Sequence, residues 1–167
     1  MGVAYKSARR LRRGFRYRYR GVEYANNMQE LTMLGGPVGE LLKKHRHTIA
    51  VAESSAGGMI SASLLSVPGA SKYFLGGGVI YTHQARRVFL ALPDTALAGI
   101  RASTEDYALK LAIQVREQYN TTWGLSETGA TGPTGNAYGD AAGHACFALV
   151  GPVQETLTLE TGSTDRE

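Results

Sequence analysis

Cysteine is almost absent from this sequence, since Cys146 is the only one among 167 residues. No internal disulfide can form, so the core must hold the fold, and a reducing, cytoplasmic location is expected. Long apolar runs are also missing, because no stretch approaches the roughly 20 residues that a membrane-spanning helix needs. We therefore expect no membrane partner.

Acidic residues are missing from the first twenty positions, which hold eight of the eighteen Lys and Arg residues. The remaining ten cations face fourteen Asp and Glu residues, so the body of the chain is mildly acidic. The net charge of +4 therefore describes the N-terminal segment and is poor evidence that the domain binds nucleic acid.

Residues 1–27 form an Arg-rich appendage with three interpretations: an organelle-targeting segment, an RNA-contacting arm, or upstream sequence translated from a misplaced start codon. The last is favoured, because Met28 opens a plausible domain start and the segment lacks the Ser-rich composition of transit peptides. Its composition predicts disorder. Residues 28–167 are then long enough for one domain and too short for two.

Hydrophobic periodicity and Gly/Pro punctuation predict alternating strands and helices. We expect helices from Pro37 to about 46, over 57–67 and 85–92, and from Ser103 onward, with a capping box at Ser103 and Asp106. We expect strands over 48–52, 79–82, 123–127, 141–150 and 156–160, with Gly76 to Gly78 as punctuation before the second. This order is typical of an α/β fold with a largely parallel sheet whose last two strands form an antiparallel hairpin.

The segment Glu53 to Gly58 follows a buried strand and leads into a helix through small residues. Such a turn places a hydroxyl at the carboxyl end of the strand and points free helix N–H groups at the same place. Ser54 could be a nucleophile there, with N–H groups near Ala56 to Gly58 binding an oxyanion or a phosphate. The alternative is that Ser54 or Ser55 only caps the helix.

A second Gly-rich segment, Thr128 to Gly135, is predicted as a loop at the same edge of the sheet. Its glycines allow close backbone approach to an anionic nucleotide, although it is not a P-loop, because no Lys follows the glycines at the required position. It could equally be a surface loop. Tyr81 and Arg86 could project to this edge, or could be an ordinary strand aromatic and a solvated helix charge.

Neither His144 with Cys146 nor His45 with His47 supplies enough ligands for a zinc site. We therefore expect no metal and no cofactor.

Four segments resemble motifs of the CinA carboxy-terminal domain family. Ala52 to Gly58 resembles A-E-S-C-T-G-G, and Gly78 to Arg86 is similar to G-x-x-x-Y-S-N-E-A-K. Ala102 to Glu105 resembles A-V-S-E-E, and Thr128 to Pro133 resembles T-G-I-A-G-P. The four motifs occur in family order and span most of residues 38–165, which argues against a chance match.

The resemblance implies a three-layer α/β/α fold with a mixed sheet. It also implies hydrolysis of nicotinamide mononucleotide to nicotinate mononucleotide and ammonia, with Ser54 as nucleophile, Tyr81 as the catalytic tyrosine and Arg86 at the position of a family lysine. Arginine stays charged in the physiological range and cannot replace a lysine base. The substrate-binding residues would be Glu53, Ser55, Ala56, Gly57, Gly58, Thr128, Gly129, Thr131, Gly132 and Gly135.

Two departures from the family pattern accompany the Arg86 substitution. Ser55 and Ala56 replace the usual Cys and Thr, and the family continues beyond residue 167 into a final helix. Without that helix, one sheet face would be exposed, or covered by the Arg-rich segment or by another subunit.

Three hypotheses follow: an amidohydrolase, a non-catalytic nucleotide-binding or interaction module of the same fold, and an RNA-binding protein that acts through residues 1–20. The expected partners are a small nucleotide substrate and further copies of the chain.

Overall fold

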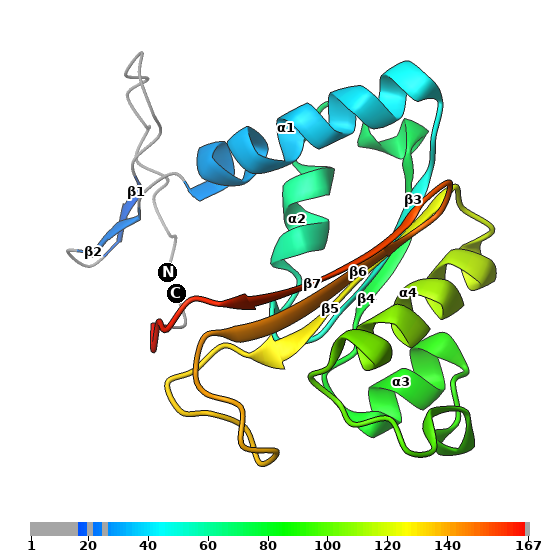
Figure 1. Cartoon of the computed structure of the whole chain (residues 1–167). Helices are drawn as coiled ribbons and strands as arrows, with labels where there is room; N and C mark the ends of the chain where they lie inside the picture. Colours follow the sequence, from blue (N-terminus) through cyan, green and yellow to red (C-terminus); the bar gives the residue numbers. More distant parts are fainter. Residues whose placement is uncertain (1–16, 20–21, 25–26, 166–167) are drawn as a thin grey trace, which may run out of the picture.

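The computed structural model describes residues 17–19, 22–24 and 27–165, with side chains from residue 31 onward. It contains a hairpin of β1 (Tyr17–Tyr19) and β2 (Val22–Tyr24), followed by an α/β domain (Figure 1). The helices of the domain are α1 (Asn27–His45), α2 (Met59–Leu65), α3 (His83–Leu90) and α4 (Glu105–Tyr119), with short 3-10 helices η1 (Ala70–Lys72) and η2 (Asp94–Leu97). Among the described helices, none is both long and apolar enough to cross a bilayer.

A five-stranded sheet in the order β4-β3-β5-β6-β7 is the centre of the domain. Its strands are β3 (Ile49–Glu53), β4 (Phe74–Val79), β5 (Trp123–Ala130), β6 (His144–Val150) and β7 (Gln154–Glu160). β3 pairs in parallel with β4 and β5, whereas β5, β6 and β7 pair antiparallel. The α/β class, the mixed sheet and the final hairpin predicted from the sequence are therefore confirmed.

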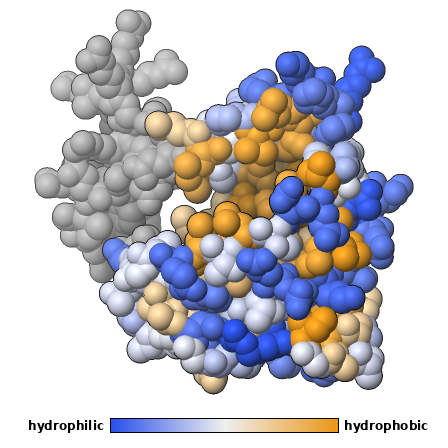
Figure 2. All heavy atoms as spheres, in the orientation of Figure 1, coloured by the Kyte–Doolittle hydropathy of each residue, from blue (hydrophilic) through white to orange (hydrophobic). Residues whose placement is uncertain are grey.

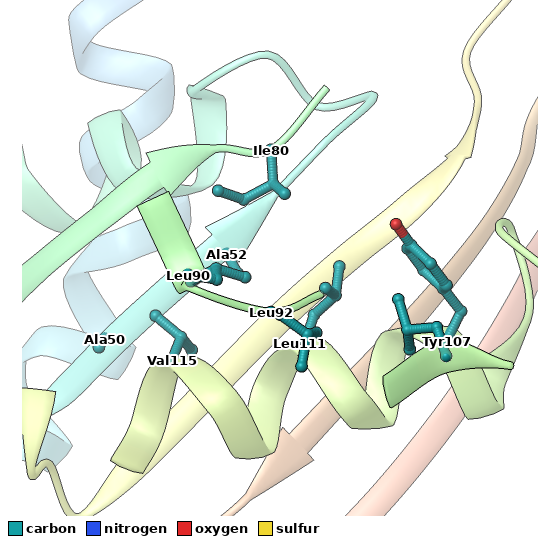
Figure 3. Packing of buried hydrophobic residues seen from close by; sticks show 9 residues of the cluster. Ala50, Ala52, Ile80, Leu90, Leu92, Tyr107, Leu111 and Val115 are labelled. Carbon is teal, nitrogen blue, oxygen red and sulfur yellow. The ribbon is translucent and has the colours of Figure 1, made fainter. Parts of the chain in front are cut away.

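The two faces of the sheet are covered by different helices. Figure 1 shows α1 and α2 on one face and α3 and α4 on the other. Because side chains alternate along a strand, β3 sends Ala50 and Ala52 into the core beneath α4, which Figure 3 shows, and Ile49 and Val51 into the core beneath α1 and α2. β3 is thus buried on both faces, and its carboxyl end lies between those of β4 and β5.

Several predicted boundaries are wrong for packing reasons. α1 runs through Gly35 to Pro37 instead of starting there, because Gly35 lies against α2, where a Cβ would come 2.2 Å from the Ser63 carbonyl oxygen. The strand predicted over 79–82 is β4, which ends at Val79 and includes Gly76 to Gly78. A Cβ at Gly76 would come 2.1 Å from the Tyr119 ring. These glycines therefore lie inside the strand and allow close packing, and they do not end the preceding element.

The predicted cap of α4 also needs correction. The N-cap of α4 is Thr104, whose hydroxyl accepts from the Tyr107 N–H at 3.2 Å, while Ser103 has a positive φ of 56°. Within residues 1–27, the structure describes β1, β2 and the first residue of α1, and the disorder of this segment stays a prediction. The rest of the appendage lies outside the described residues.

An apolar surface remains open along α1 and the outer strands. Leu34 and Leu41 of α1 are 72% and 57% exposed, and Leu157 of β7 is 53% exposed. Leu157 is paired with Phe147 on the face that α1 and α2 cover in part. Figure 2 shows hydrophobic atoms over α1 and in the hollow between α1 and the sheet.

Candidate functional site

The turn after β3 carries the predicted nucleophile. β3 ends at the buried Glu53, α2 starts at Met59, and the chain between them turns sharply. Gly57 and Gly58 have positive φ values of 63° and 106°, a conformation that side chains with a Cβ rarely adopt. The glycines are therefore required by the geometry of the turn.

Glu53 stabilises the start of α2 from the preceding strand. Its fully buried carboxylate accepts from the N–H groups of Gly58, Ile60 and Ser61 at 3.0 to 3.1 Å, and from the Ser61 hydroxyl at 2.5 Å. Helix N-terminal N–H groups lack partners within the helix and carry partial positive charge, so a carboxylate suits them. The Glu53 carboxylate is therefore satisfied by three backbone N–H groups and one hydroxyl of the protein itself.

Glu127 holds the other half of the turn. This residue of β5 is 2% exposed, and its carboxylate accepts from the N–H groups of Ser54 and Ala56, both at 2.9 Å, and from the Ser55 hydroxyl. Sequence reasoning missed Glu127. The signal that could have revealed it is an acid inside an otherwise buried strand, where a carboxylate requires donors nearby.

These bonds overturn one prediction about the site. Of the amides expected to be free for an oxyanion or phosphate, Ala56 donates to Glu127, Gly57 to the Ser54 carbonyl at 3.1 Å and Gly58 to Glu53. All three N–H groups therefore have acceptors within the protein, and their role in binding an anion stays a prediction. Within the described part of the turn, the Ser55 N–H is the one amide without a protein acceptor.

The capping interpretation of the serines is also wrong. The N-cap of α2 is Gly58, which has no side-chain cap bond, and Ser55 donates to Glu127. The Ser54 side chain is half-buried, and its hydroxyl makes no hydrogen bond to any other described residue. A hydroxyl left available in a fixed turn is compatible with a nucleophile, a role that stays a prediction.

Tyr81 lies at the same edge of the sheet. The N–H of Ile80 donates to the Glu53 carbonyl at 2.6 Å, so Tyr81 and Ser54 each follow one partner of this bond. Tyr81 lies beyond the end of β4 at Val79 and is 62% exposed, so it is not an ordinary strand aromatic.

The sequence suggests that Arg86 either projects toward the Ser54 edge of the sheet or is a solvated charge on a helix. The structure shows neither arrangement. Arg86 is 3% exposed, so it is not a solvated helix charge. Its Nε donates to the Leu92 carbonyl at 3.3 Å, Nη1 donates to the Tyr107 hydroxyl at 3.1 Å, and Nη2 pairs with Asp94. These partners lie in α4, η2 and the loop before η2, and none belongs to the turn around Ser54.

The Gly-rich segment is divided between strand and loop. Thr128 and Gly129 belong to β5, which runs to Ala130, so the predicted loop begins too early. Thr128 is only 3% exposed, and a Cβ at Gly129 would come 2.3 Å from the His144 carbonyl oxygen and 3.1 Å from the Ser55 hydroxyl. Gly129 thus serves close packing around Ser55.

The remainder of that segment lies in the loop between β5 and β6. Thr131 is half-buried, Gly132 has a φ of 109°, and Gly135 packs on the Asp140 carbonyl oxygen, 2.1 Å from where its Cβ would lie. The bend at Gly132 and the packing at Gly135 explain these two glycines without a ligand.

A separate hydrogen-bonded cluster surrounds His144. Its Nδ1 lies 2.5 Å from Glu160, and its Nε2 lies 3.0 Å from the Ser103 carbonyl and 3.4 Å from the Cys146 sulfur. Burial lowers the pKa of His144, but the bonds to Glu160 and to the Ser103 carbonyl raise it above its ordinary value. Burial raises the pKa of the Cys146 thiol, which makes it a poor nucleophile.

Metal ligands do not gather in the resolved part of the fold. His47 accepts a bond from the Trp123 ring N–H at 3.1 Å and stacks beside His45. Over residues 31–165, no three His, Cys, Asp or Glu side chains are placed to hold an ion together.

Comparison of the chain with known proteins identifies its family. Residues 32–167 match the family model described as "CinA C-terminal domain". The chain belongs to this family. The CinA-like protein of Myxococcus xanthus is 39% identical over 130 residues, which cover 76% of this chain and 31% of that protein. A "putative competence-damage inducible protein" of Desulforamulus reducens is 41% identical over 69% of this chain and 28% of its own length.

Solved structures agree with the CinA fold. A CinA superfamily protein from Enterobacter cloacae has a TM-score of 0.73 at 26% identity and covers 81% of this chain and 80% of its own. The competence or damage-inducible protein from Enterobacter asburiae has the same TM-score at 25% identity, covering 81% of this chain and 86% of its own. The present CinA domain spans about a third of the length of the curated relatives it matches.

Proposed function

We propose that this CinA domain hydrolyses the carboxamide of nicotinamide mononucleotide, giving nicotinate mononucleotide and ammonia, with Ser54 as nucleophile. The observation that carries the proposal is the Ser54 hydroxyl, which has no hydrogen bond within the described residues and lies in a turn fixed by two buried carboxylates. A nucleophile held by rigid surroundings is positioned without further cost when substrate binds.

The proposed reaction divides into two steps. The Ser54 oxygen attacks the carboxamide carbon, its proton passes through Tyr81 or water to the leaving nitrogen, and ammonia leaves an ester on Ser54. Water then hydrolyses this ester, releases the carboxylate and returns the proton to Ser54. The oxyanion of each step requires a donor, and the Ser55 N–H is the amide of the turn that no described residue occupies.

The roles proposed for the other site residues change with the geometry. Arg86 is engaged by Asp94, Tyr107 and Leu92, so it supports the fold of α3 and η2 and does not act as a base. Glu53 and Glu127 are positioning residues of the turn, and Gly57 and Gly58 give it its shape.

Ammonia release from nicotinamide mononucleotide tests the proposal. The unsubstituted chain is compared with Ser54→Ala and with Ser71→Ala, a matched variant at an exposed serine of η1. We expect Ser54→Ala to abolish release and to keep the thermal unfolding midpoint, since the serine fills little core volume. Equal turnover by Ser54→Ala and Ser71→Ala would remove Ser54 from the mechanism.

One observation favours a second candidate, a nucleotide-binding module without catalysis. If hydrolysis in this fold needs a neutral amine at position 86, the buried, ion-paired Arg86 cannot supply it. Saturable binding of nicotinamide mononucleotide by calorimetry, with no release of ammonia by the unsubstituted chain, would support this candidate over the amidohydrolase.

A further inference from the structure

Residues 161–165 follow β7 and lie against the loop between β5 and β6, and we call them the strap. The Thr161 N–H donates to the Gly143 carbonyl at 3.0 Å, and the Thr161 hydroxyl donates to the same oxygen at 3.3 Å. Figure 1 shows the strap and the loop at the same end of the sheet. The strap is thus joined to the loop where the loop enters β6.

Two glycines of the loop, one near each end, allow the strap to approach closely. Gly143 has a φ of 86°, and a Cβ there would come 2.9 Å from the backbone nitrogen of Ser163. Gly132 has a φ of 109°, and a Cβ there would come 2.9 Å from the Thr164 carbonyl oxygen. Because the strap contacts both ends of the loop, it restricts how far the loop can move.

One side-chain contact anchors the start of the strap to the sheet. Glu160, the last residue of β7, lies 2.5 Å from Nδ1 of His144. Nε2 of the same ring lies 3.0 Å from the Ser103 carbonyl oxygen. A carboxylate and a carbonyl only accept hydrogen bonds, so each ring nitrogen must carry a hydrogen. A neutral imidazole carries one such hydrogen, and the arrangement therefore requires the imidazolium.

Loss of one proton from the ring removes one of these two bonds. The bond to the Ser103 carbonyl is buried and the ring is 8% exposed, so an unpaired acceptor there would be costly. The Glu160 side chain is 62% exposed, and water can replace the imidazole at its carboxylate. The neutral ring should therefore keep the hydrogen on Nε2 and lose its contact with Glu160.

The surroundings of the ring favour the charged form near neutral pH. Burial lowers the pKa of His144, but the bonds to Glu160 and to the Ser103 carbonyl, together with the negative charges of Glu160 and Asp140, raise it above its ordinary value. The imidazolium therefore persists to a higher pH than in an exposed histidine, and is lost as the pH rises through the folded-state pKa.

The other titratable groups near the ring are already paired or neutral. Asp140 of the loop forms an ion pair with Arg101 at 2.5 Å. Cys146 of β6 lies 3.4 Å from Nε2, and burial raises the pKa of its thiol, which stays protonated near pH 7. On the side of α4, Glu105 accepts from the Thr158 hydroxyl at 2.6 Å. The contact with Glu160 is thus the one that changes when His144 titrates.

We propose that the strap is a pH-sensitive closure over the loop between β5 and β6, closed when His144 is protonated and released when the ring is neutral. Release starts at Glu160 and leaves the bonds of Thr161 to Gly143 as the remaining attachment. The loop contains Thr131, Gly132 and Gly135, so release frees a segment that the sequence predicts to bind substrate. The device itself does not depend on Ser54 or on amide hydrolysis.

Amide hydrogen exchange of the full chain, followed by NMR from about pH 5 to about pH 9, tests the strap. The Thr161 N–H reports the strap, and the N–H of the fully buried Val51 in β3 reports opening of the whole fold. After correction for the intrinsic pH dependence of exchange, the protection of Thr161 should fall about tenfold relative to Val51. The midpoint of this fall should coincide with the titration of the His144 ring.

Two substitutions in β7 separate the anchor from a general effect of charge. Glu160→Gln places a carboxamide beside the ring, which can donate to a bare Nδ1 and accept from a protonated one, so closure should become independent of pH. Glu155→Gln removes the same charge at another exposed position of β7 and should keep the pH dependence of the unsubstituted chain.

Three results would overturn the strap. A parallel loss of protection at Thr161 and Val51 would show that the titration acts on the whole fold. Titration of the His144 ring without any change at Thr161 would show that the ring does not hold the strap. The same pH dependence in Glu160→Gln as in the unsubstituted chain would remove Glu160 as the anchor. None of these measurements involves ammonia release, so the amidohydrolase proposal is tested separately.

Discussion

Replacing Arg86 by lysine distinguishes a structural arginine from a catalytic position. The Arg86 side chain is 3% exposed and reaches three acceptors in different directions: the Leu92 carbonyl, the Tyr107 hydroxyl and Asp94. A lysine ammonium is a compact charge at the end of a flexible chain and cannot reproduce this fork. We expect Arg86→Lys to lose about two of the three hydrogen bonds.

The size of the loss follows from the burial of each acceptor. A buried hydrogen bond contributes about 0.5–1.5 kcal/mol, and leaving a buried acceptor unpaired costs about 1–3 kcal/mol. The Leu92 and Tyr107 bonds are buried, whereas Asp94 is 60% exposed and its ion pair contributes little. We therefore expect Arg86→Lys to lower the free energy of unfolding by about 2–3 kcal/mol.

Urea unfolding followed by circular dichroism measures this change, with Arg87→Lys as the control. Arg87 is adjacent, binds the same Asp94 at 2.8 Å and is 48% exposed, so its replacement should cost less than about 0.5 kcal/mol. Equal unfolding midpoints for the two variants would refute the structural role. The sequence motifs alone predict the opposite, namely that lysine at position 86 increases amide hydrolysis. Faster release of ammonia by Arg86→Lys would support a catalytic role for position 86.

Three further predictions concern the fold around the site. Because the pKa of His144 is raised, its bonds to Glu160 and Ser103 stabilise the fold fully below about pH 6.5, and this stabilisation is lost as the pH rises through the folded-state pKa. The urea midpoint should therefore fall over that range, and it should fall less steeply in His144→Gln. Gly124→Ala would place a Cβ 2.1 Å from the Ala112 carbonyl oxygen of α4, so we expect a loss of about 1–3 kcal/mol or more in thermal unfolding, and a loss below 0.5 kcal/mol would contradict the close packing of α4 on β5. Ser55→Ala removes one of the three donors to Glu127 and should cost about 1 kcal/mol in urea unfolding, against no change for the exposed Ser71→Ala; identical midpoints would mean that the Ser55 bond contributes nothing.

The sequence predicts those elements whose pattern depends on neighbours along the chain. α4 repeats apolar residues at helical spacing, and β6 and β7 are separated by so few residues that a hairpin is the simplest connection. The sequence also predicts that Ser54 and Tyr81 share one edge of the sheet, because parallel strands bring their carboxyl ends together. The bond from the Ile80 N–H to the Glu53 carbonyl confirms this proximity.

The failures share a different cause, contacts between residues far apart in the sequence. The sequence alone suggests that Gly76 breaks a strand, because it does not show that the Tyr119 ring packs on this glycine. It also suggests that the N–H groups of Ala56 and Gly58 are free, because it does not show that Glu127 and Glu53 accept from them. Arg86 reads as exposed or catalytic because Asp94 and Tyr107 converge on it only in the folded chain.

The dependence of the Ser54 turn on Glu127 has a consequence for folding kinetics. Ser54 and Glu127 are 73 residues apart, so the turn acquires its anchor only when β5 pairs with β3, a non-local step that follows closure of a long loop. The β5-β6-β7 meander can form from near neighbours, but a partly folded chain holding only that meander lacks the anchored turn. Recovery of any activity that needs Ser54 should therefore coincide with the slowest folding phase and not with the first appearance of β-structure.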